Sequence, residues 1–196
     1  PKIEEKVGNP LSPYAVSKKS NELYAKVFKE VYDFNSIGLR YFNIFGPNQS
    51  PDGPYAAVIP LYMNALLQNQ SAKIFGDGLQ TRSFLHVSEC VEALLRLMKS
   101  DFLGPVNIGS EEKVSINQLA QMAIDISGKS ITIDNIQGQD FIAKYGFKCP
   151  IGVRGRNSDN TLFKEKLGWE VSQPLIEGMK STYSWIDKQV DISNNS

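Results

Sequence analysis

The sequence predicts an α/β protein, in which short strands alternate with amphipathic helices along 196 residues. Three observations support this fold class: apolar residues recur at helical spacing, β-rich runs end at Gly-Pro or Gly-Asp-Gly, and capping residues open several helices. A chain of this length can bury a substantial core without disulfides or a structural metal.

The first predicted helix covers residues 12–34. Ser12 can cap it, and Pro13 suits its first turn because the nitrogen there needs no helical partner. Its apolar residues recur at helical spacing: Val16, Leu23, Val27, Phe28 and Val31. The segment "SIGLRYFNIFGP" follows, and its run over residues 37–45 predicts a buried strand that ends at Gly46-Pro47.

The middle of the chain continues the alternation. The loop "GPNQSPDGPY" leads to a helix over residues 56–68, and "AKIFGDGLQTRSFLHV" predicts two strands around a turn at Gly76-Asp77-Gly78. No helix opens directly after this turn, so we do not expect it to hold a phosphate. We expect Ser88 to cap the next helix, which continues to about residue 99.

The last part of the chain predicts three more helices. After a short strand in "PVNIGS", Ser115 and Gln118 form a capping box that opens an amphipathic helix. A strand over residues 131–133 and a long polar loop to about residue 158 follow. The remaining helices are expected over residues 161–167 and 175–189, and the terminal "DISNNS" is expected to fray.

Composition excludes several classes of protein. Hydrophobic residues make up 41% of the chain, and no apolar run reaches the roughly 18 residues of a membrane span. Lys plus Arg equals Asp plus Glu at 21 each, so no basic surplus points to a nucleic acid. Cys90 and Cys149 lack a C-x-x-C pattern, which favours reduced thiols in a cytoplasmic setting. His86 is the single histidine, so we expect a hydrogen-bonded structural residue there and no metal site.

The segment "LSPYAVSKKSNELYAKVF" contains a candidate catalytic pair. Tyr14 and Lys18 are four residues apart, so they share one face of the predicted helix. An ammonium beside a phenol favours the phenolate, which would let a tyrosine with an unperturbed pKa near ~10 act as a base. Taken alone, the pair also fits an ordinary helix with a half-buried aromatic residue and a solvated charge. This second interpretation stays open at this point.

Four further segments bear on that choice: "LRYFNIFGP", "FGDGLQTRSFLHVSECVEALL", "PVNIGS" and "GRNSDNTLFKEKLGWEVSQPLIEGM". In this order they resemble segments of the extended short-chain dehydrogenase/reductase family, which includes nucleotide-sugar epimerases and dehydratases. With the Y-x-x-x-K pair they are spread over almost the whole chain, in the family's order. The resemblance implies that Tyr14 and Lys18 are the family's catalytic tyrosine and lysine.

The resemblance also implies NAD as the cofactor. In this family the tyrosine removes a proton from a sugar hydroxyl while hydride passes to NAD, and the lysine hydrogen-bonds the nicotinamide ribose. Tyr14, Lys18 and Phe42 would therefore lie near the nicotinamide. Oxidation of a secondary alcohol needs this arrangement, a base within reach of the O–H and a hydride acceptor on the opposite side.

The substrate that the resemblance implies is a sugar joined to a nucleoside diphosphate. Arg82 and Arg156 match the family's diphosphate-binding arginines, and the planar guanidinium holds phosphate oxygens through paired hydrogen bonds. Asn43 matches an asparagine that contacts the diphosphate and the sugar. The helix start at Ala57 and Val58 could add free backbone N–H groups.

The chain departs from the family in what it lacks. The Gly-rich dinucleotide fingerprint does not occur in the sequence, and the serine or threonine that completes the catalytic set would precede Pro1. We therefore expect the C-terminal portion of a longer enzyme. Residues 1–50 and 83–112 would be remaining elements of a Rossmann-like NAD-binding domain, and residues 51–82 and 113–196 a smaller mixed α/β substrate-binding lobe. We expect a homodimer at full length, and an isolated chain that binds NAD weakly and is inactive.

Two subfamilies compete for the activity. "SPYAVSKKSNELYAKVF" and "IGLRYFNIFGPNQSPDGPYAAVIP" resemble UDP-N-acetylhexosamine 4-epimerases, whereas "FGDGLQTRSF" and "VRGRNSDNTLFKEKLGW" resemble GDP-mannose 3,5-epimerase. The latter uses a lysine just before the helix at Ala57, where this chain has Tyr55-Ala56. We therefore favour epimerisation at C4 through a transient 4-keto sugar. A 4,6-dehydratase is a further alternative, and a catalytically silent nucleotide-sugar-binding lobe is an alternative of another class.

Overall fold

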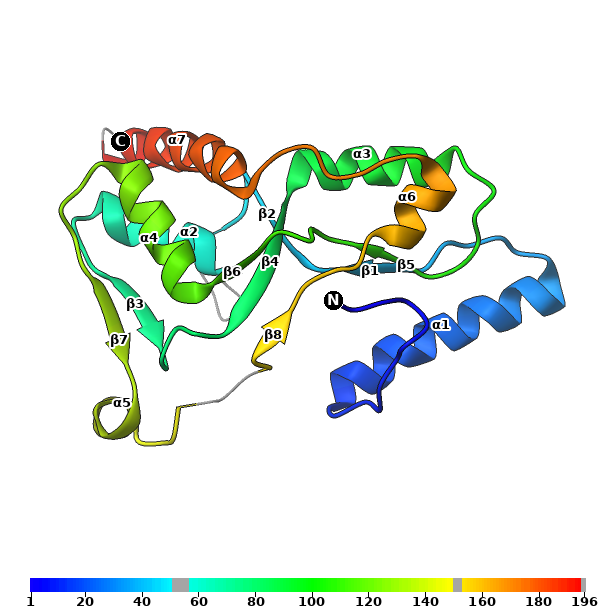
Figure 1. Ribbon diagram of the computed structural model, residues 1–196, viewed down its shortest axis with the longest axis horizontal. Helices are drawn as coiled ribbons and strands as arrows, with labels where there is room; N and C mark the ends of the chain where they lie inside the picture. Colours follow the sequence, from blue (N-terminus) through cyan, green and yellow to red (C-terminus); the bar gives the residue numbers. More distant parts are fainter. Residues whose placement is uncertain (51–56, 150–152, 195–196) are drawn as a thin grey trace.

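The computed structural model describes residues 1–50, 57–149 and 153–194, and it confirms the predicted α/β fold class (Figure 1). Helices flank several short strands along the whole length of the molecule. The elements in chain order are α1 (Pro13–Tyr32), β1 (Leu39–Tyr41), β2 (Asn43–Phe45), α2 (Val58–Leu67), β3 (Ala72–Phe75), β4 (Thr81–His86), α3 (Val87–Met98), β5 (Val106–Ile108), β6 (Lys113–Ser115), α4 (Ile116–Ser127), β7 (Ile133–Ile136), α5 (Gly138–Tyr145), β8 (Gly155–Arg156), α6 (Thr161–Leu167) and α7 (Leu175–Asn194).

The strands form small sheets, and β4 organises the one that matters most for the site. β1 pairs parallel with β5, and β3 pairs parallel with β7. The second half of β4 pairs parallel with β2. Its first half lies between β6, which is antiparallel to it, and β8, which is parallel. The register of β4 therefore decides which residues of three other strands face one another.

The predicted strand over residues 37–45 is in fact two strands. β1 belongs to the sheet with β5, whereas β2 belongs to the sheet with β4. Phe42 lies between them, and its N–H donates to the carbonyl oxygen of Ile108 at 2.9 Å. The run is also less buried than predicted, since within the two strands Phe45 alone is buried. The chain passes from one sheet to the other at Phe42 because the two halves of the run find different partner strands.

Two hydrophobic clusters stabilise the fold, and Figure 1 shows their helices at opposite ends of the molecule. One cluster packs α2, α4 and α7 against β3 and β4, around the fully buried Met63 and Met179. The other packs α3 and α6 against β5, around Phe163 and Val106. Burial of apolar surface in each is the main stabilising term. α1 contributes to neither cluster, and none of its residues is buried.

Several local predictions are confirmed. The Ser12 hydroxyl accepts a hydrogen bond from the N–H of Ala15 and caps α1. Ser115 and Gln118 form the capping box of α4 with both reciprocal hydrogen bonds. The Gly76-Asp77-Gly78 segment is a turn, and both glycines have the positive φ angles that other residues rarely adopt. α6 covers the predicted residues.

Five other local predictions differ from the structure. α3 is capped by His86 rather than Ser88: the His86 Nδ1 accepts from the Ser88 N–H at 3.3 Å, which makes His86 a hydrogen-bonded structural residue as expected. β7 lies at Ile133–Ile136 instead of 131–133, because pairing with β3 sets its register. The predicted polar loop contains α5 and β8. α7 continues through the expected frayed residues to Asn194, and α2 begins at Val58, with residue 56 outside the described part of the chain.

The described helices include none that is long and apolar enough to cross a membrane. Within the same residues, no group of three or more His, Cys, Asp and Glu side chains could hold a metal ion. Cys90 is buried, Cys149 is half-buried, and both are free thiols.

Candidate active site

The exposed face of α1 carries Tyr14 and Lys18. The Lys18 Nζ lies over the ring of Tyr14, 5.4 Å from its centroid, so the two side chains share one face of the helix. Tyr14 is 70% exposed. Among the described residues Lys18 forms no ion pair, and the carboxylate one turn further along, Glu22, is held by Arg40 with an N–O distance of 2.6 Å. The ammonium of Lys18 is therefore available to donate hydrogen bonds to a ligand.

A pair of arginines forms the second part of the site. Arg82 of β4 and Arg156 of β8 are register partners, so their strands set two cationic residues side by side. Burial, followed by the positive charge of Arg156, lowers the pKa of Arg82 from its usual range. The hydrogen bond that Arg82 makes goes to the carbonyl oxygen of Thr81 at 2.8 Å, and no described carboxylate pairs with either arginine. Two neighbouring cations without counter-charges have the charge and the donors to bind a ligand with several negative charges.

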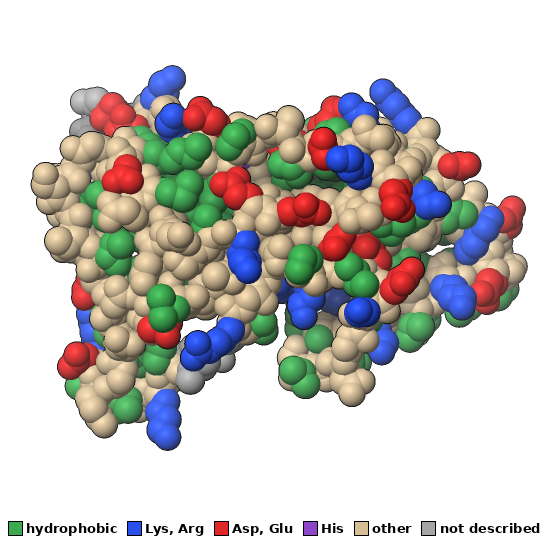
Figure 2. Space-filling model, in the orientation of Figure 1, with side chains coloured by type: hydrophobic (Ala, Val, Ile, Leu, Met, Phe, Trp, Pro, Cys, Tyr) green, Lys and Arg blue, Asp and Glu red, His purple; other side chains and the backbone are tan. Residues whose placement is uncertain are grey.

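This excess of positive charge is local. The chain has no net charge at pH 7, and Figure 2 shows acidic and basic side chains interspersed over one face of the molecule without a large patch of either sign. An anionic ligand would thus be recognised by the arginine pair itself and not by a general basic surface.

Phe42 contacts Arg156, and Asn43 is hydrogen-bonded to the strand that carries Arg82. The guanidinium carbon of Arg156 stands 5.2 Å from the ring centroid of Phe42, a cation–π contact. The Asn43 Nδ2 donates to the carbonyl oxygen of Ser83 at 2.8 Å, which holds this amide next to the strand that carries Arg82. Four of the predicted site residues, from β2, β4, β8 and the β1–β2 junction, are thus brought together.

Gly109 permits this close packing, and the sequence analysis did not single it out. A Cβ at position 109 would lie 2.7 Å from the Cβ of Ser158 and 2.9 Å from the Cβ and Cγ of Phe42. Such distances leave no room for a side chain. The available signal was a glycine that directly follows a buried strand, a place where another part of the backbone often approaches closely.

Ala57 and Val58 form the start of α2. Ala57 is the N-cap, and it gives no side-chain hydrogen bond to the helix. Pro60 lacks an N–H, so the free donors of the first turn are those of Val58 and Ile59. The sequence analysis expected such donors, and the structure adds that a proline limits their number.

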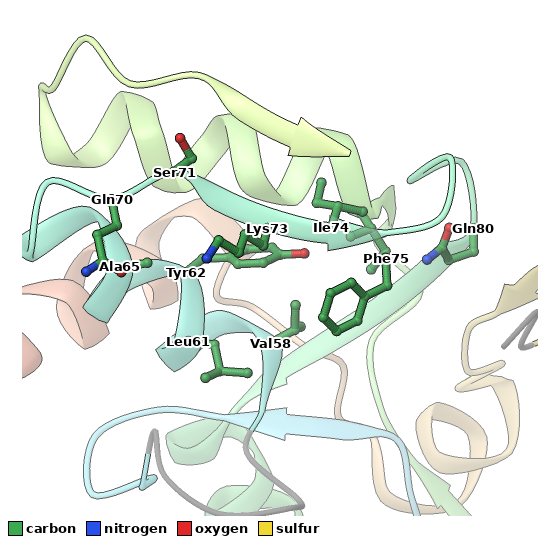
Figure 3. A pocket seen from close by; sticks show the side chains of 11 residues that line it. Val58, Leu61, Tyr62, Ala65, Gln70, Ser71, Lys73, Ile74, Phe75 and Gln80 are labelled. Atoms are coloured by element: carbon green, nitrogen blue, oxygen red, sulfur yellow. The ribbon is translucent and has the colours of Figure 1, made fainter. Parts of the chain in front are cut away.

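Beside this helix start lies a cavity of about 430 Å³. Figure 3 shows its walls: α2 contributes Val58 and Tyr62, and β3 contributes Phe75, with Gln80 at one end. Gln80 precedes Arg82 by two residues, so this end of the cavity lies near the start of β4, the strand that carries Arg82. Burial raises the pKa of the Tyr62 phenol, which therefore stays neutral. The walls are mainly apolar and aromatic, as in sites that take a flat ring.

The two groups of predicted residues belong to different elements around a notch. Figure 2 shows this notch at the lower edge of the molecule, between the part that holds β8 and the amino-terminal end of α1 in the orientation of Figure 1. Tyr14 and Lys18 belong to α1 and Arg156 to β8, and no hydrogen bond or ion pair among the described residues joins Tyr14 or Lys18 to either arginine.

Comparison with known proteins identifies relatives over almost the whole chain. The family model described as GDP-mannose 4,6 dehydratase matches residues 1–182. GDP-mannose 3,5-epimerase of Arabidopsis thaliana is 40% identical over 183 residues, which are 93% of this chain and 46% of that protein. The chain thus spans about half the length of the curated relatives it matches.

Solved structures agree. UDP-N-acetylglucosamine 4-epimerase from Methanobrevibacter ruminantium M1, in complex with UDP-N-acetylmuramic acid, has a TM-score of 0.86 at 32% identity over 96% of this chain and 58% of that chain. UDP-glucuronic acid 4-epimerase from Bacillus cereus, with UDP-glucuronic acid and NAD, has a TM-score of 0.80 at 27% identity over 96% and 56%. On the strength of the family match and these relatives, the chain belongs to the extended short-chain dehydrogenase/reductase family of nucleotide-sugar epimerases and dehydratases.

Proposed function

We infer that this chain is the catalytic-helix and substrate-binding part of an NAD-dependent nucleotide-sugar epimerase that acts at C4. The observation that carries the proposal is the register of β4 and β8, in which Arg82 and Arg156 stand side by side without counter-charges next to Phe42 and Asn43. A diphosphate would supply the negative counter-charge for the two arginines. The planar guanidinium of each can bind two of its oxygens.

The acid–base chemistry falls to Tyr14 and Lys18. Tyr14 is exposed at the start of α1 with its ring under the ammonium of Lys18. Tyr14 takes the proton of the C4 hydroxyl and returns it after the keto sugar has turned over in the site. Lys18 has no carboxylate partner among the described residues, so its N–H groups can hold the ribose of the cofactor.

The residues present fit one end of NAD. NAD bound there would supply the hydride acceptor for oxidation at C4 and the hydride donor for reduction of the keto sugar. Tyr14 and Lys18 suit its nicotinamide ribose, and in this proposal the buried ring of Phe42 lies on the nicotinamide side of the site. The relative from Bacillus cereus was solved with NAD, which supports this choice of cofactor.

The position of the cavity suggests where the diphosphate and the nucleobase of the substrate bind. The N–H groups at Ala57 and Val58 and the side chain of Asn43 assist the arginines at the diphosphate. The apolar cavity beyond Val58 and Gln80 takes the nucleobase, whose flat ring suits the aromatic wall at Phe75. In this proposal residues 1–50 and 83–112 belong to the cofactor side, and residues 51–82 and 113–196 to the substrate side. We also propose a cytoplasmic enzyme of carbohydrate biosynthesis that works as a homodimer at full length.

A second candidate function is 3,5-epimerisation of GDP-mannose. The 40% identity to the enzyme of Arabidopsis thaliana favours it. Just before Ala57 this chain has Tyr55 and Ala56 where that enzyme has a lysine, which argues against this candidate. Both residues lie outside the described part of the chain.

Product analysis tests the proposal. The protein, in the length that its gene encodes, is incubated with NAD and a panel of UDP- and GDP-sugars. We expect interconversion of the two C4 epimers of a UDP-N-acetylhexosamine. Conversion of GDP-mannose at C3 and C5 would instead establish the second candidate. Binding of nucleotide sugars without any conversion would leave the chain as a silent binding lobe, and the catalytic proposal would be wrong.

A further inference from the structure

α1 is held to the rest of the molecule in an unusual way. None of its twenty residues is buried. Its half-buried residues are Ala15, Ser20, Glu22, Ala25 and Lys29, and three of these five have side chains too short to interlock with a neighbour. Within the described residues, a polar contact therefore gives α1 its direction relative to its neighbours.

The contact that does so joins Glu22 of α1 to Arg40 of β1. The Arg40 Nε donates to Glu22 Oε1 at 2.6 Å, and a terminal nitrogen of the same guanidinium donates to Glu22 Oε2 at 2.8 Å. Both side chains keep less than a third of their surface exposed. Among the described residues, no other side-chain hydrogen bond or ion pair connects α1 with another element. A two-point contact between planar groups fixes direction as well as distance.

Arg40 also donates a hydrogen bond to the first residues of the chain. Its remaining terminal nitrogen donates to the carbonyl oxygen of Glu4 at 2.8 Å. The Glu4 carboxylate in turn accepts from the backbone N–H of Asn107 at 2.8 Å, and the Asn107 side chain donates to the carbonyl oxygen of Lys2 at 2.7 Å. Residues 2–4 are thus fastened at both ends against β5.

The same segment reaches the strand that carries Arg156. The Lys2 N–H donates to the carbonyl oxygen of Asn157 at 2.9 Å, and the N–H of Asp159 donates to the carbonyl oxygen of Lys2 at 3.0 Å. A continuous series of hydrogen bonds therefore runs from Glu22 through Arg40 and residues 2–4 to the residues next to Arg156. We name residues 2–4, with the Glu22–Arg40 pair, the positioning strap.

We propose that the positioning strap sets the catalytic helix relative to the anion-binding arginines, so that Arg40 and Glu22 are positioning residues for Tyr14 and Lys18. This inference rests on the proposed function. Tyr14 is eight residues from Glu22, about 12 Å along the helix axis at 1.5 Å per residue. A rotation of a few degrees about the Glu22 contact moves the Tyr14 end by about 1 Å, and a misplacement of that size can cost up to about a hundredfold in rate.

The test uses the protein as its gene encodes it, four variants of the Glu22–Arg40 pair and one control variant. Glu22→Gln and Arg40→Gln each break the ion pair, and the double variant completes a thermodynamic cycle. Arg40→Lys keeps the positive charge without the fork, and so remains informative if Arg40→Gln fails to fold. Glu30→Gln is the matched control, because Glu30 is an exposed carboxylate on α1 that contacts Lys26 of the same helix.

Two measurements are made on each variant. The first is hydrogen exchange of α1, which should speed up at least tenfold in the three pair variants and the double variant while α2, α4 and α7 stay unchanged. The second is turnover with the nucleotide sugar that the wild type converts. We expect kcat to fall at least tenfold with KM within about twofold, and the double variant to resemble the single variants because the pair acts as a unit.

The outcomes separate this inference from the proposed function. If the wild type converts no nucleotide sugar, the proposed function fails, and unchanged exchange in α1 would overturn the strap on its own. If the wild type is active, an unchanged kcat in Glu22→Gln or Arg40→Lys overturns the positioning role. A fall in kcat that Glu30→Gln reproduces would also overturn it, because the effect would then come from any charge lost on α1.

Discussion

The close packing at Gly109 leads to a prediction about stability and the site together. In Gly109→Ala, the new Cβ would lie 2.7 Å from the Ser158 Cβ and 2.9 Å from Phe42, whereas ordinary contacts begin at 3.4 Å. Either the segment with Ser158 or the segment with position 109 must therefore move by about 0.7 Å, the difference between 2.7 Å and 3.4 Å. Overpacking of this kind costs about 1–3 kcal/mol of unfolding free energy. For a chain of 196 residues, that lowers Tm by roughly 2–12 °C, at about 2–4 °C per kcal/mol.

Thermal and urea unfolding followed by circular dichroism measure this loss. Gly38→Ala is the control, because a Cβ there would meet Pro105 at an ordinary 3.5 Å. We expect the control to stay within about 0.5 kcal/mol of the wild type. Since Phe42 contacts Arg156, Gly109→Ala should also weaken nucleotide-sugar binding, which calorimetry detects. If Gly109→Ala is as stable as Gly38→Ala, the reasoning from the close approach is refuted.

Three further predictions concern the charged and acid–base residues. Tyr14→Phe should bind the nucleotide sugar normally while turnover falls by about 10²–10⁴-fold, the usual loss of a general base; wild-type turnover would remove Tyr14 from the mechanism. Arg82→Ala and Arg156→Ala should each weaken nucleotide-sugar binding by about 1.5–3 kcal/mol, measured by calorimetry. If both variants bind as tightly as the wild type, the two arginines are surface charges without a role in binding. Hydrogen bonds from Arg40 hold the pKa of Glu22 below its ordinary value of 4.5. The ionised carboxylate therefore stabilises the fold above about pH 4.5, and this contribution is lost as the pH falls through the lowered pKa. Acid titration of unfolding should therefore affect Glu22→Gln less than the wild type, and parallel curves would contradict this.

The sequence was most informative where a structure depends on neighbouring residues. The Ser12 cap, the Ser115–Gln118 box and the Gly-Asp-Gly turn each need only a few consecutive residues, and all three are confirmed. The alternation of helices and strands likewise follows from apolar periodicity, so the fold class was predictable.

The elements that were missed depend on distant partners. α5 lies in a polar stretch and gains its place because Phe141 packs against Phe75, 5.4 Å away between ring centroids. β8 is two residues long and exists through its pairing with β4. No local pattern separates the run over residues 37–45 into two strands, since the division is made by β5 and β4.

The candidate site shows the same contrast. Tyr14 and Lys18 could be paired from their spacing alone, because four residues make just over one helical turn. The meeting of Arg82 with Arg156 could be inferred only through the family resemblance, since it depends on a register between strands 74 residues apart in the sequence. Glu22 and Arg40 gave no signal beyond their charges, and their contact became apparent only in three dimensions.

The long sequence separations within the positioning strap bear on how the protein folds during synthesis. The hydrogen bonds from Asn107 to Glu4 and to Lys2 span 103 and 105 residues. A ribosome that adds about 5–20 residues per second needs roughly 5–20 s to make that intervening chain. Residues 2–4 are therefore translated well before their partners and reach their places late, after β5 has emerged. Until then the hydrogen bonds between residues 2–4 and β5 cannot form, so the direction that they help to give α1 is acquired only after β5 has been made.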